Sequence, residues 1–213
     1  MLPRGHRYIV VEGPIGVGKS SLARLLAEHA SADTLFEQPA DNPFLASFYQ
    51  DPRRWGLATQ LFFLFQRVNQ LGGLKQLDLF ERPTVSDFLF EKDPLFARLN
   101  LSDDELALYQ RIYEHLAPQV PVPDLVIYLQ APVDTLVSRV RRRGAAFERG
   151  ISEEYLARLS QAYARFFHDY NRAPVLTVNS RNLNFVDRPA DFALLLRRIT
   201  EMRGPREFFS LGG

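Results

Sequence analysis

Runs of apolar or β-branched residues alternate along the chain with longer segments in which apolar residues recur at helical spacing. The runs predict strands at 8–11, 34–36, 84–86, 125–129 and 175–178. The periodic segments predict helices at 21–28, 55–79, 102–116, 132–143, 152–170 and 190–202. Strands that alternate with helices are typical of a mainly parallel sheet covered by helices on both faces. The pattern therefore predicts an α/β fold.

Local signals mark the boundaries of several of these elements. Asp41-Asn42-Pro43 predicts a helix start, and Ser102 with Glu105 three residues later forms a capping box. The proline-rich stretch 118–123 predicts a connector before the strand at 125–129. No internal repeat or linker divides the chain. We therefore expect a single domain over residues 1–203 and a mobile tail over residues 204–213.

Composition excludes several classes of function. The 213 residues are 46% hydrophobic and 24% charged with a net charge of +1, so no overall field favours a nucleic-acid or membrane partner. The absence of cysteine excludes disulfides and thiol chemistry, and the four histidines lack metal-ligand spacing. No apolar run reaches the roughly 20 residues of a membrane span, and residues 1–6 lack the features of a signal peptide. We therefore expect a cytoplasmic protein.

A glycine-rich loop joins the first strand to the first helix. It matches the phosphate-binding pattern G-x-x-x-x-G-K-[ST] with Gly13, Pro14, Ile15, Gly16, Val17, Gly18, Lys19 and Ser20, and Ser21 follows. Glycines let backbone N–H groups converge on phosphate oxygens, and the following helix directs its positive end at them. Lys19 is expected to reach the β- and γ-phosphates and Ser20 to ligate Mg²⁺. The sequence therefore predicts a P-loop protein that binds ATP and Mg²⁺.

Arginines concentrate at the end of the predicted helix 132–143. Arg139, Arg141, Arg142 and Arg143 precede Gly144 and a loop, so residues 139–151 are interpreted as an arginine-rich lid. A kinase needs such cations because charge develops on the transferred phosphoryl group. The alternatives are a solvated basic helix end and a nucleic-acid patch. The guanine-specific motif N-K-x-D of the switch proteins is absent, which favours a kinase.

The ordered motifs resemble those of the deoxyribonucleoside kinase family, and in particular the bacterial deoxyadenosine and deoxyguanosine kinases. The segment 36–43, Phe-Glu-Gln-Pro-Ala-Asp-Asn-Pro, resembles the family's segment after the second strand. The stretch from Tyr49 to Trp55 resembles its Tyr-x-x-Pro-x-x-Trp motif, and Gln60 and Arg67 have the family's spacing on one helix face. The resemblance covers most of the chain and implies the P-loop kinase fold.

The resemblance implies a role for each matching residue. Glu37 would be the general base for a sugar 5′-hydroxyl, and Tyr49 and Glu148 would contact the 3′-hydroxyl. Phosphoryl charge would be stabilised by Lys19, Arg139 and Arg143. The nucleobase would be contacted by Gln60, Arg67 and Asp93. Mg²⁺ would be bound by Ser20 and Asp87. Phe185 is the candidate that packs on the donor adenine.

Two positions depart from the family pattern. Family members have arginine after the acidic residue that matches Asp87, whereas this chain has Phe88, and Ala145 stands where many members have a third lid arginine. Phe88 cannot supply a cation, and Lys92 is the candidate substitute. The departure leaves both Glu37 and Asp87 as candidates for the catalytic base.

These observations predict ATP-dependent phosphorylation of the 5′-hydroxyl of a deoxyribonucleoside, a purine by resemblance, in nucleotide salvage. The partner is expected to be this small molecule, and relatives suggest a homodimer, for which the apolar helix face at 57–71 is one candidate contact and internal burial the alternative. One competing hypothesis is a nucleoside monophosphate kinase of the thymidylate type. The other is a nucleotide-binding regulatory protein with degenerate catalysis, which the Phe88 departure favours.

Overall fold

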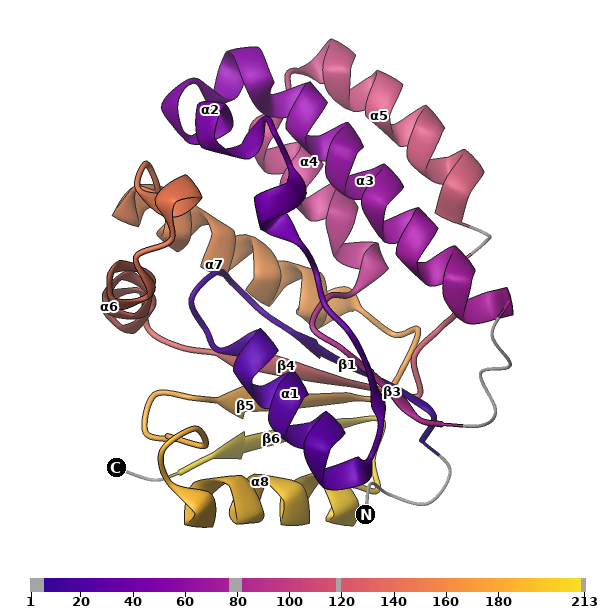
Figure 1. The fold of residues 1–213 in the computed structure, drawn as a ribbon, viewed down its shortest axis with the longest axis vertical. Helices are drawn as coiled ribbons and strands as arrows, with labels where there is room; N and C mark the ends of the chain where they lie inside the picture. The colour runs from indigo at the N-terminus through magenta and orange to yellow at the C-terminus, as the bar shows by residue number, and fades with distance from the viewer. Residues whose placement is uncertain (1–5, 77–81, 118–119, 212–213) are drawn as a thin grey trace.

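The computed structural model describes residues 6–76, 82–117 and 120–211. Its sheet has six parallel strands in the order β2-β3-β1-β4-β5-β6 (Figure 1). The strands are β1 (Tyr8–Glu12), β2 (Asp33–Leu35), β3 (Thr84–Ser86), β4 (Leu125–Gln130), β5 (Val175–Asn179) and β6 (Arg206–Ser210). The predicted α/β fold with a mainly parallel sheet is therefore confirmed.

The described helices connect these strands and cover the sheet. They are α1 (Lys19–Ala30), α2 (Leu45–Gln50), α3 (Pro52–Gln76), α4 (Asp93–Asn100), α5 (Asp103–Leu116), α6 (Val133–Arg143), α7 (Glu153–Asp169) and α8 (Pro189–Glu201). Short 3₁₀ turns occur at η1 (Pro39–Asp41), η2 (Phe90–Lys92) and η4 (Ala146–Glu148). The last residues of the helix expected at 55–79, and the first two of the connector expected at 118–123, lie outside the described residues. None of the described helices is long and apolar enough to cross a membrane.

Several helix boundaries follow from local chemistry. The capping box of Ser102 and Glu105 begins α5 as expected. At α6, Gly144 ends the helix in the left-handed conformation, with φ of 63°. The start expected at Asp41-Asn42-Pro43 is displaced: the Asn42 side chain accepts a hydrogen bond from Phe44 N, and α2 begins only at Leu45.

Alternating side chains of the buried strands contribute to two cores on opposite faces of the sheet. In β1, Ile9 and Val11 join the core that contains α1 and α8, whereas Tyr8 and Val10 join the core that contains α3, α4, α5 and α7. Figure 1 shows α3, α4 and α5 together at the top of the molecule and α8 at the bottom. The site described below lies where elements of both cores meet.

The C-terminal segment differs from the expectation of a mobile tail. Arg206–Ser210 form β6, which pairs in parallel with β5 from Val175↔Arg206 to Asn179↔Ser210. Phe209 is 8% exposed and packs into the core with α1 and α8, and Arg198 lies over its ring. The expectation was wrong here because the open edge of β5 offers hydrogen-bond partners that no local sequence signal shows.

The strand order brings the connecting loops of the site together. Strands β3 and β2 lie on one side of β1, and β4, β5 and β6 lie on the other. The direction in which strands are added therefore reverses beside β1. Such a reversal leaves a crevice at the carboxyl ends of parallel strands, where ligands commonly bind. The glycine-rich loop begins directly after β1, and so lies at this crevice.

Candidate functional site

The glycine-rich loop has a shape that only glycine permits. Gly16 has φ of 84°, and a Cβ atom there would lie 2.8 Å from Val140 Cγ2 and 2.9 Å from Leu136 O of α6. Gly18, with φ of 106°, immediately precedes α1. The loop therefore passes close to α6 and delivers its backbone to the N-terminus of α1. This is the strand–loop–helix arrangement that the motif requires for phosphate binding.

Lys19 and Ser20 lie at the first turn of α1. Lys19 Nζ donates to Gly13 O at 2.8 Å and to Pro14 O at 3.3 Å, so its ammonium group lies on the loop. Burial lowers the pKa of Lys19, and the charge of Glu12 opposes that effect. Ser20 Oγ donates to Asp87 Oδ2. The first turn of α1 therefore holds a cation and a hydroxyl beside a carboxylate.

Asp87 follows β3 and is buried. Its Oδ1 accepts a hydrogen bond from Glu37 N at 2.7 Å, while Oδ2 accepts from Ser20. Burial raises the pKa of this carboxyl, and the hydrogen bond from Ser20 counteracts it. Within the described residues no cluster of three His, Cys, Asp or Glu side chains could hold a metal ion. A hydroxyl and a carboxylate are nevertheless the hard oxygen donors that Mg²⁺ takes from a protein when phosphates and water complete its shell.

A cavity opens beside the loop and brings most of the predicted residues together. The loop contributes Ile15, Gly16, Lys19 and Ser20 to its lining. The lining also contains seven of the other predicted site residues: Glu37, Tyr49, Gln60, Arg67, Asp87, Arg143 and Glu148. Aromatic side chains complete the wall, among them Phe48, Phe63, Phe96, Phe147 and Tyr155. A cavity that combines aromatic walls with polar and charged groups at defined positions is typical of a small-molecule site.

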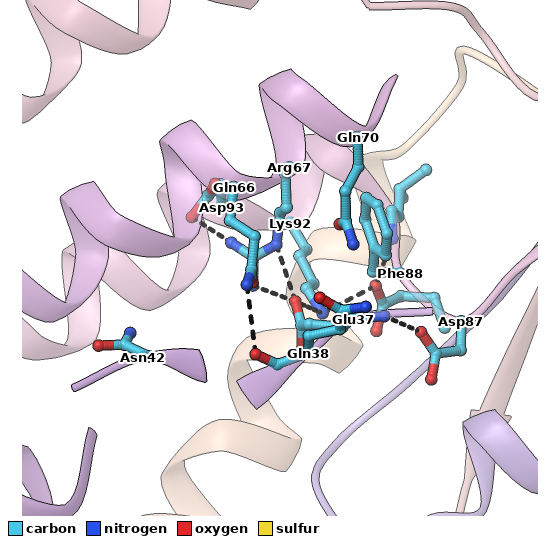
Figure 2. A network of polar contacts seen from close by, with 12 residues as sticks. Glu37, Gln38, Asn42, Gln66, Arg67, Gln70, Asp87, Phe88, Lys92 and Asp93 are labelled. Atoms are coloured by element: carbon cyan, nitrogen blue, oxygen red, sulfur yellow. Dashed lines mark hydrogen bonds and ion pairs between the residues drawn. The ribbon is translucent and has the colours of Figure 1, made fainter. Parts of the chain in front are cut away.

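Glu37 receives positive charge from two elements of the cavity wall. Arg67 of α3 donates to Glu37 Oε1 from Nε at 2.8 Å and also from Nη2, and Lys92 Nζ lies 3.4 Å from the same oxygen (Figure 2). Burial raises the pKa of Glu37, but the charges of Arg67, Lys92 and Lys19 outweigh burial and lower it to about 2. Glu37 is therefore an ionised carboxylate at neutral pH.

Asp93 lies behind Arg67 rather than on the cavity surface. It is fully buried, and its Oδ1 is 2.7 Å from Arg67 Nη1. The charges of Asp93 and Glu37 raise the pKa of Arg67 above its ordinary value despite burial. Asp93 is not among the residues that line the cavity. Its contribution to the site is therefore the orientation of the Arg67 guanidinium.

The predicted sugar contacts are brought together from two parts of the chain. Tyr49 of α2 and Glu148 of η4 both line the cavity. Arg143 Nε donates to Glu148 Oε2 at 2.9 Å, and Nη2 donates to Oε1. The backbone at residue 150 passes close to Tyr49, and only glycine fits there, because a Cβ atom at Gly150 would lie 2.8 Å from Tyr49 Cβ. The segment after α6 therefore packs on α2 at the cavity mouth.

Arg139 lies in an adjoining hollow on the other side of the glycine-rich loop. Its Nη1 donates to Val17 O at 3.0 Å and to Ser180 Oγ at 3.2 Å, and Nη2 donates to Ser180 O at 3.1 Å. This hollow shares Lys19, Ser20 and Arg143 with the cavity and is also lined by Val17, Gly18, Ser21 and Phe185. Phe185 packs against the position of Gly18. The two spaces meet at the residues that are expected to bind the transferred phosphate.

One charged residue of the site was missed in the sequence. Glu12 at the end of β1 is fully buried and accepts hydrogen bonds from Gly13 N at 2.8 Å, Leu89 N at 2.7 Å and Tyr163 Oη at 3.0 Å. A carboxylate ending a continuous apolar strand beside a glycine-rich loop was the signal that could have found it. Phe88, in contrast, is buried in the core with α3 and α7 and supplies no polar group.

Comparison with known proteins supports the interpretation of these motifs. A family model described as deoxynucleoside kinase matches residues 9–202. The chain is 32% identical over 200 residues to the deoxyguanosine kinase of Bacillus subtilis, with 92% of this chain and 97% of that protein covered. It is 31% identical over 209 residues to the deoxyadenosine kinase of Lactobacillus acidophilus, with 92% and 95% covered.

Solved structures give the same fold. The deoxyadenosine kinase from M. mycoides with bound dATP superposes with a TM-score of 0.79 at 24% identity, over 91% of this chain and 100% of that chain. That degree of identity shows the fold alone. Together with the family model over residues 9–202 and the relatives above 30% identity, it confirms the resemblance given by the sequence motifs. The chain belongs to the deoxynucleoside kinase family.

Proposed function

We propose that this kinase transfers the γ-phosphate of ATP to the 5′-hydroxyl of a purine deoxyribonucleoside. The observation that carries the proposal is one continuous cavity that joins phosphate-loop residues Lys19 and Ser20 to Glu37, Gln60 and Arg67. A phosphoryl donor and a hydroxyl acceptor could therefore meet beside an ionised carboxylate. Effective phosphoryl transfer depends mainly on such positioning and on charge stabilisation.

Glu37 is the better of the two candidate bases. Both oxygens of Asp87 already accept hydrogen bonds, from Ser20 and from Glu37 N, whereas in the described part of the chain the cationic contacts of Glu37 are to Oε1 alone. Oε2 is left to accept the proton of the acceptor hydroxyl. A low pKa suits a loose transition state, in which the hydroxyl loses its proton late and the carboxylate chiefly orients it. The oxygen of the hydroxyl then bonds to the γ-phosphorus as the bond to ADP breaks.

The remaining charged groups fit a role at the phosphates. Lys19 would contact the β- and γ-phosphates, and Arg143 lines both the cavity and the hollow, where the transferred group would pass. Arg139 is held by Val17 O and Ser180 in the hollow, on the side expected for the donor. Ser20 and Asp87 would hold Mg²⁺, which when bound neutralises phosphate charge.

The purine deoxyribonucleoside is supported by the cavity wall and by the names of the relatives. Gln60 lines the cavity with an amide that offers one donor and one acceptor group to a base edge, and Arg67 adds fixed N–H donors. Tyr49 and Glu148, which line the same cavity, would contact the sugar. Relatives of 27% to 32% identity are named deoxyguanosine or deoxyadenosine kinases. The homodimer and the cytoplasmic location remain predictions from the sequence.

A panel of acceptors tests the proposal. Purified protein with Mg-ATP is incubated with each deoxyribonucleoside, ribonucleoside and deoxynucleoside monophosphate, and nucleotide products are separated by chromatography. We expect transfer to deoxyadenosine or deoxyguanosine at the highest kcat/KM, and 5′-monophosphates as products. Transfer to monophosphates alone would assign the chain to the thymidylate type. Binding of ATP without transfer to any acceptor would favour a regulatory protein.

A further inference from the structure

Lys92 is a buried lysine in the wall of the proposed acceptor site. It ends the turn η2, is 1% exposed, and lines the cavity with Glu37 and Asp87. A lysine so deeply buried is rare unless its charge is paired. Its Nζ lies 3.4 Å from Glu12 Oε2 and 3.4 Å from Glu37 Oε1, and 5.7 Å from the ring centroid of Phe96. Lys92 therefore bridges a structural carboxylate and the proposed base. Figure 2 shows the lysine beside the proposed base, Glu37.

The chain after β3 is folded so that Lys92, and not Phe88, reaches this position. Ser86 Oγ donates to Phe88 O at 2.9 Å and accepts from Phe88 N at 3.2 Å, which fixes a tight turn. Leu89 N then donates to Glu12 Oε2 at 2.7 Å. The Phe88 ring enters the core, and η2 follows with Lys92 directed at Glu12 and Glu37. The cation beside the base thus comes from a position four residues further along the chain.

The balance of charge shows why this cation is needed. Four carboxylates are gathered here, Glu12, Glu37, Asp87 and Asp93, against three cations, Lys19, Arg67 and Lys92. Arg67 is shared between Glu37 and Asp93, and Lys19 is turned onto the loop. Glu12 has three hydrogen-bond donors besides Lys92, so most of its roughly four acceptor sites are filled without the lysine, which supplies the cation that pairs its charge. Glu37 depends on Lys92 for the second cationic contact at Oε1.

We propose that Lys92 is a positioning residue for the phosphoryl transfer: its ammonium group and Arg67 together hold Oε1 of Glu37, so that Oε2 faces the acceptor hydroxyl. This inference rests on the proposed function. In the step, the hydroxyl proton passes to Oε2, the hydroxyl oxygen bonds to the γ-phosphorus, and the bond to the bridging oxygen breaks with its electrons on ADP. Glu37 afterwards releases the proton to water. Lys92 keeps its proton throughout and acts only through Glu37.

Steady-state kinetics of Lys92→Met and Lys92→Arg give the first test. Methionine matches the length of lysine without its charge, so kcat should fall by roughly 10²-fold, as when one fixed charge-stabilising donor is removed. KM for the deoxynucleoside should change less than about threefold, because Gln60 and Arg67 are unaltered. Lys92→Arg should recover at least about tenfold of the lost kcat. A near-normal kcat in Lys92→Met, or a rise in KM alone, would overturn the proposal.

A double-mutant cycle separates the two carboxylates that Lys92 contacts. Removal of Lys92 leaves Glu12 as a buried unpaired charge, which by itself destabilises the fold. The substitution Glu12→Gln removes that charge, so Lys92→Met in the Glu12→Gln background should have urea-unfolding stability close to that of Glu12→Gln alone. We expect the same roughly 10²-fold loss of kcat in this background. If the loss disappears once Glu12 is neutral, Lys92 serves only the fold and the proposal is wrong.

The absence of cysteine permits a rescue experiment in which two adducts of the same variant are compared, so that differences in folding between variants do not enter. Lys92→Cys would carry the single thiol of the chain, at a position that lines the cavity. Alkylation with 2-bromoethylamine restores a lysine-like ammonium group, whereas iodoacetamide adds a neutral group of similar size. With alkylation verified by mass spectrometry, the aminoethylated protein should regain at least about tenfold in kcat and the carbamidomethylated protein should not. Equal rates for the two adducts would contradict a role for the charge.

Failure of the inference is distinguishable from failure of the proposed function. The wild-type acceptor panel reports on the function, and the ratio of wild type to Lys92→Met reports on the lysine. An active deoxynucleoside kinase with a ratio near one overturns the inference alone. If the panel finds only monophosphate transfer, the proposed function fails and the ratio measured with that acceptor still decides the role of Lys92. A wild type that transfers to no acceptor overturns both.

Discussion

Glu37 and Asp87 show how two neighbouring carboxylates acquire different properties. A hydrogen bond from Glu37 N to Asp87 Oδ1 links them. Glu37 is surrounded by cations, which lower its pKa to about 2, whereas burial dominates at Asp87 and raises its pKa. Glu37 therefore stays ionised and is suited to orient a hydroxyl. Asp87, bonded to Ser20, is suited to a role near the metal.

Turnover of Glu37→Gln and Asp87→Asn should differ in their dependence on Mg²⁺. We expect Glu37→Gln to lower kcat by a factor of order 10²–10⁴ at any Mg²⁺ concentration, because the amide cannot accept the proton. Asp87→Asn should instead raise the Mg²⁺ concentration needed for half-maximal rate. Titration of Mg²⁺ at fixed ATP in both variants measures this. Near-normal turnover in Glu37→Gln would move the role of base to Asp87.

The pKa of Glu37 also makes a prediction about stability. Its carboxyl has a pKa of about 2 in the folded protein and an ordinary value of 4.5, so the folded state favours the ionised form. The resulting stabilisation, about 3 kcal/mol, is present above about pH 4.5 and is lost as the pH falls toward 2. Urea unfolding between pH 3 and 6 should therefore show a smaller pH dependence in Glu37→Gln than in the wild type. Parallel curves for the two proteins would contradict the assignment.

Only part of the arrangement of the site residues could be predicted from the sequence. Lys19 could be placed in a phosphate site from its loop motif, and Tyr49, Gln60 and Glu148 could be added through their resemblance to a known family; the structure brings all four to one cavity. The position of Asp93 behind Arg67 could not be predicted in this way, because it depends on the packing of α4 against α3. Motifs shared with a family indicate which residues meet, whereas packing decides which of them lines the cavity.

At the scale of elements, α3 is the frame that positions the proposed base. Gln70 Nε2 donates to Phe36 O at 3.1 Å and Gln66 Nε2 donates to Gln38 O at 3.3 Å, on either side of the Glu37 contact with Arg67. Figure 2 shows Gln66, Arg67 and Gln70 together on α3 above Glu37 and Gln38. Three residues within two turns of one helix thus hold three consecutive residues after β2. Because α3 spans Pro52–Gln76, the segment that carries Glu37 is fixed against a long rigid element rather than left as a free loop.

Strand β6 gives a prediction with a matched control. Phe209 is 8% exposed in the core, whereas its neighbour Phe208 is 62% exposed. We expect Phe209→Ala to lower the free energy of unfolding by about 3 kcal/mol, the usual cost of truncating a core phenylalanine, and Phe208→Ala to change it by less than about 0.5 kcal/mol. Urea unfolding measures both. Equal effects of the two substitutions would mean that residues 206–210 do not form a packed strand.

Strand β6 could not be predicted from the local sequence, whereas β1 and β4 could. Val10 and Ile127 belong to continuous apolar runs, so β1 and β4 are evident from the sequence alone. The run Arg206–Ser210 is short, half polar and preceded by Gly204-Pro205, which is typical of a tail. Its structure depends on pairing with β5, about 30 residues earlier in the chain. The local sequence pattern carries no information about pairing with the free edge of a distant strand.

At the scale of the whole molecule, each of the two cores supports a different part of the proposed site: one supports the hollow and the other the cavity. The hollow with Phe185 and Arg139 is built from α1, α6 and the segment after β5, whose apolar residues belong to the core with α8. The cavity with Tyr49 and Arg67 is built from α2, α3 and η4, on the side of the core with α7. The glycine-rich loop after β1 is the boundary between the two sides. Donor and acceptor are therefore expected to approach the same lysine from different layers of the fold.

This division predicts how ligands stabilise the molecule. A non-hydrolysable ATP analogue at 100 times its Kd should add about 2.7 kcal/mol to the free energy of unfolding, which for a chain of 213 residues raises Tm by roughly 5–10 °C. EDTA should reduce that shift in the wild type, because the phosphates lose their metal. In Ser20→Ala and Asp87→Asn the remaining shift should respond less to EDTA, since each variant lacks one of the two proposed protein ligands of Mg²⁺. Thermal unfolding monitored by fluorescence measures each case. A full shift that is insensitive to EDTA in the wild type would show that the nucleotide binds without the metal, and would remove Ser20 and Asp87 from that role.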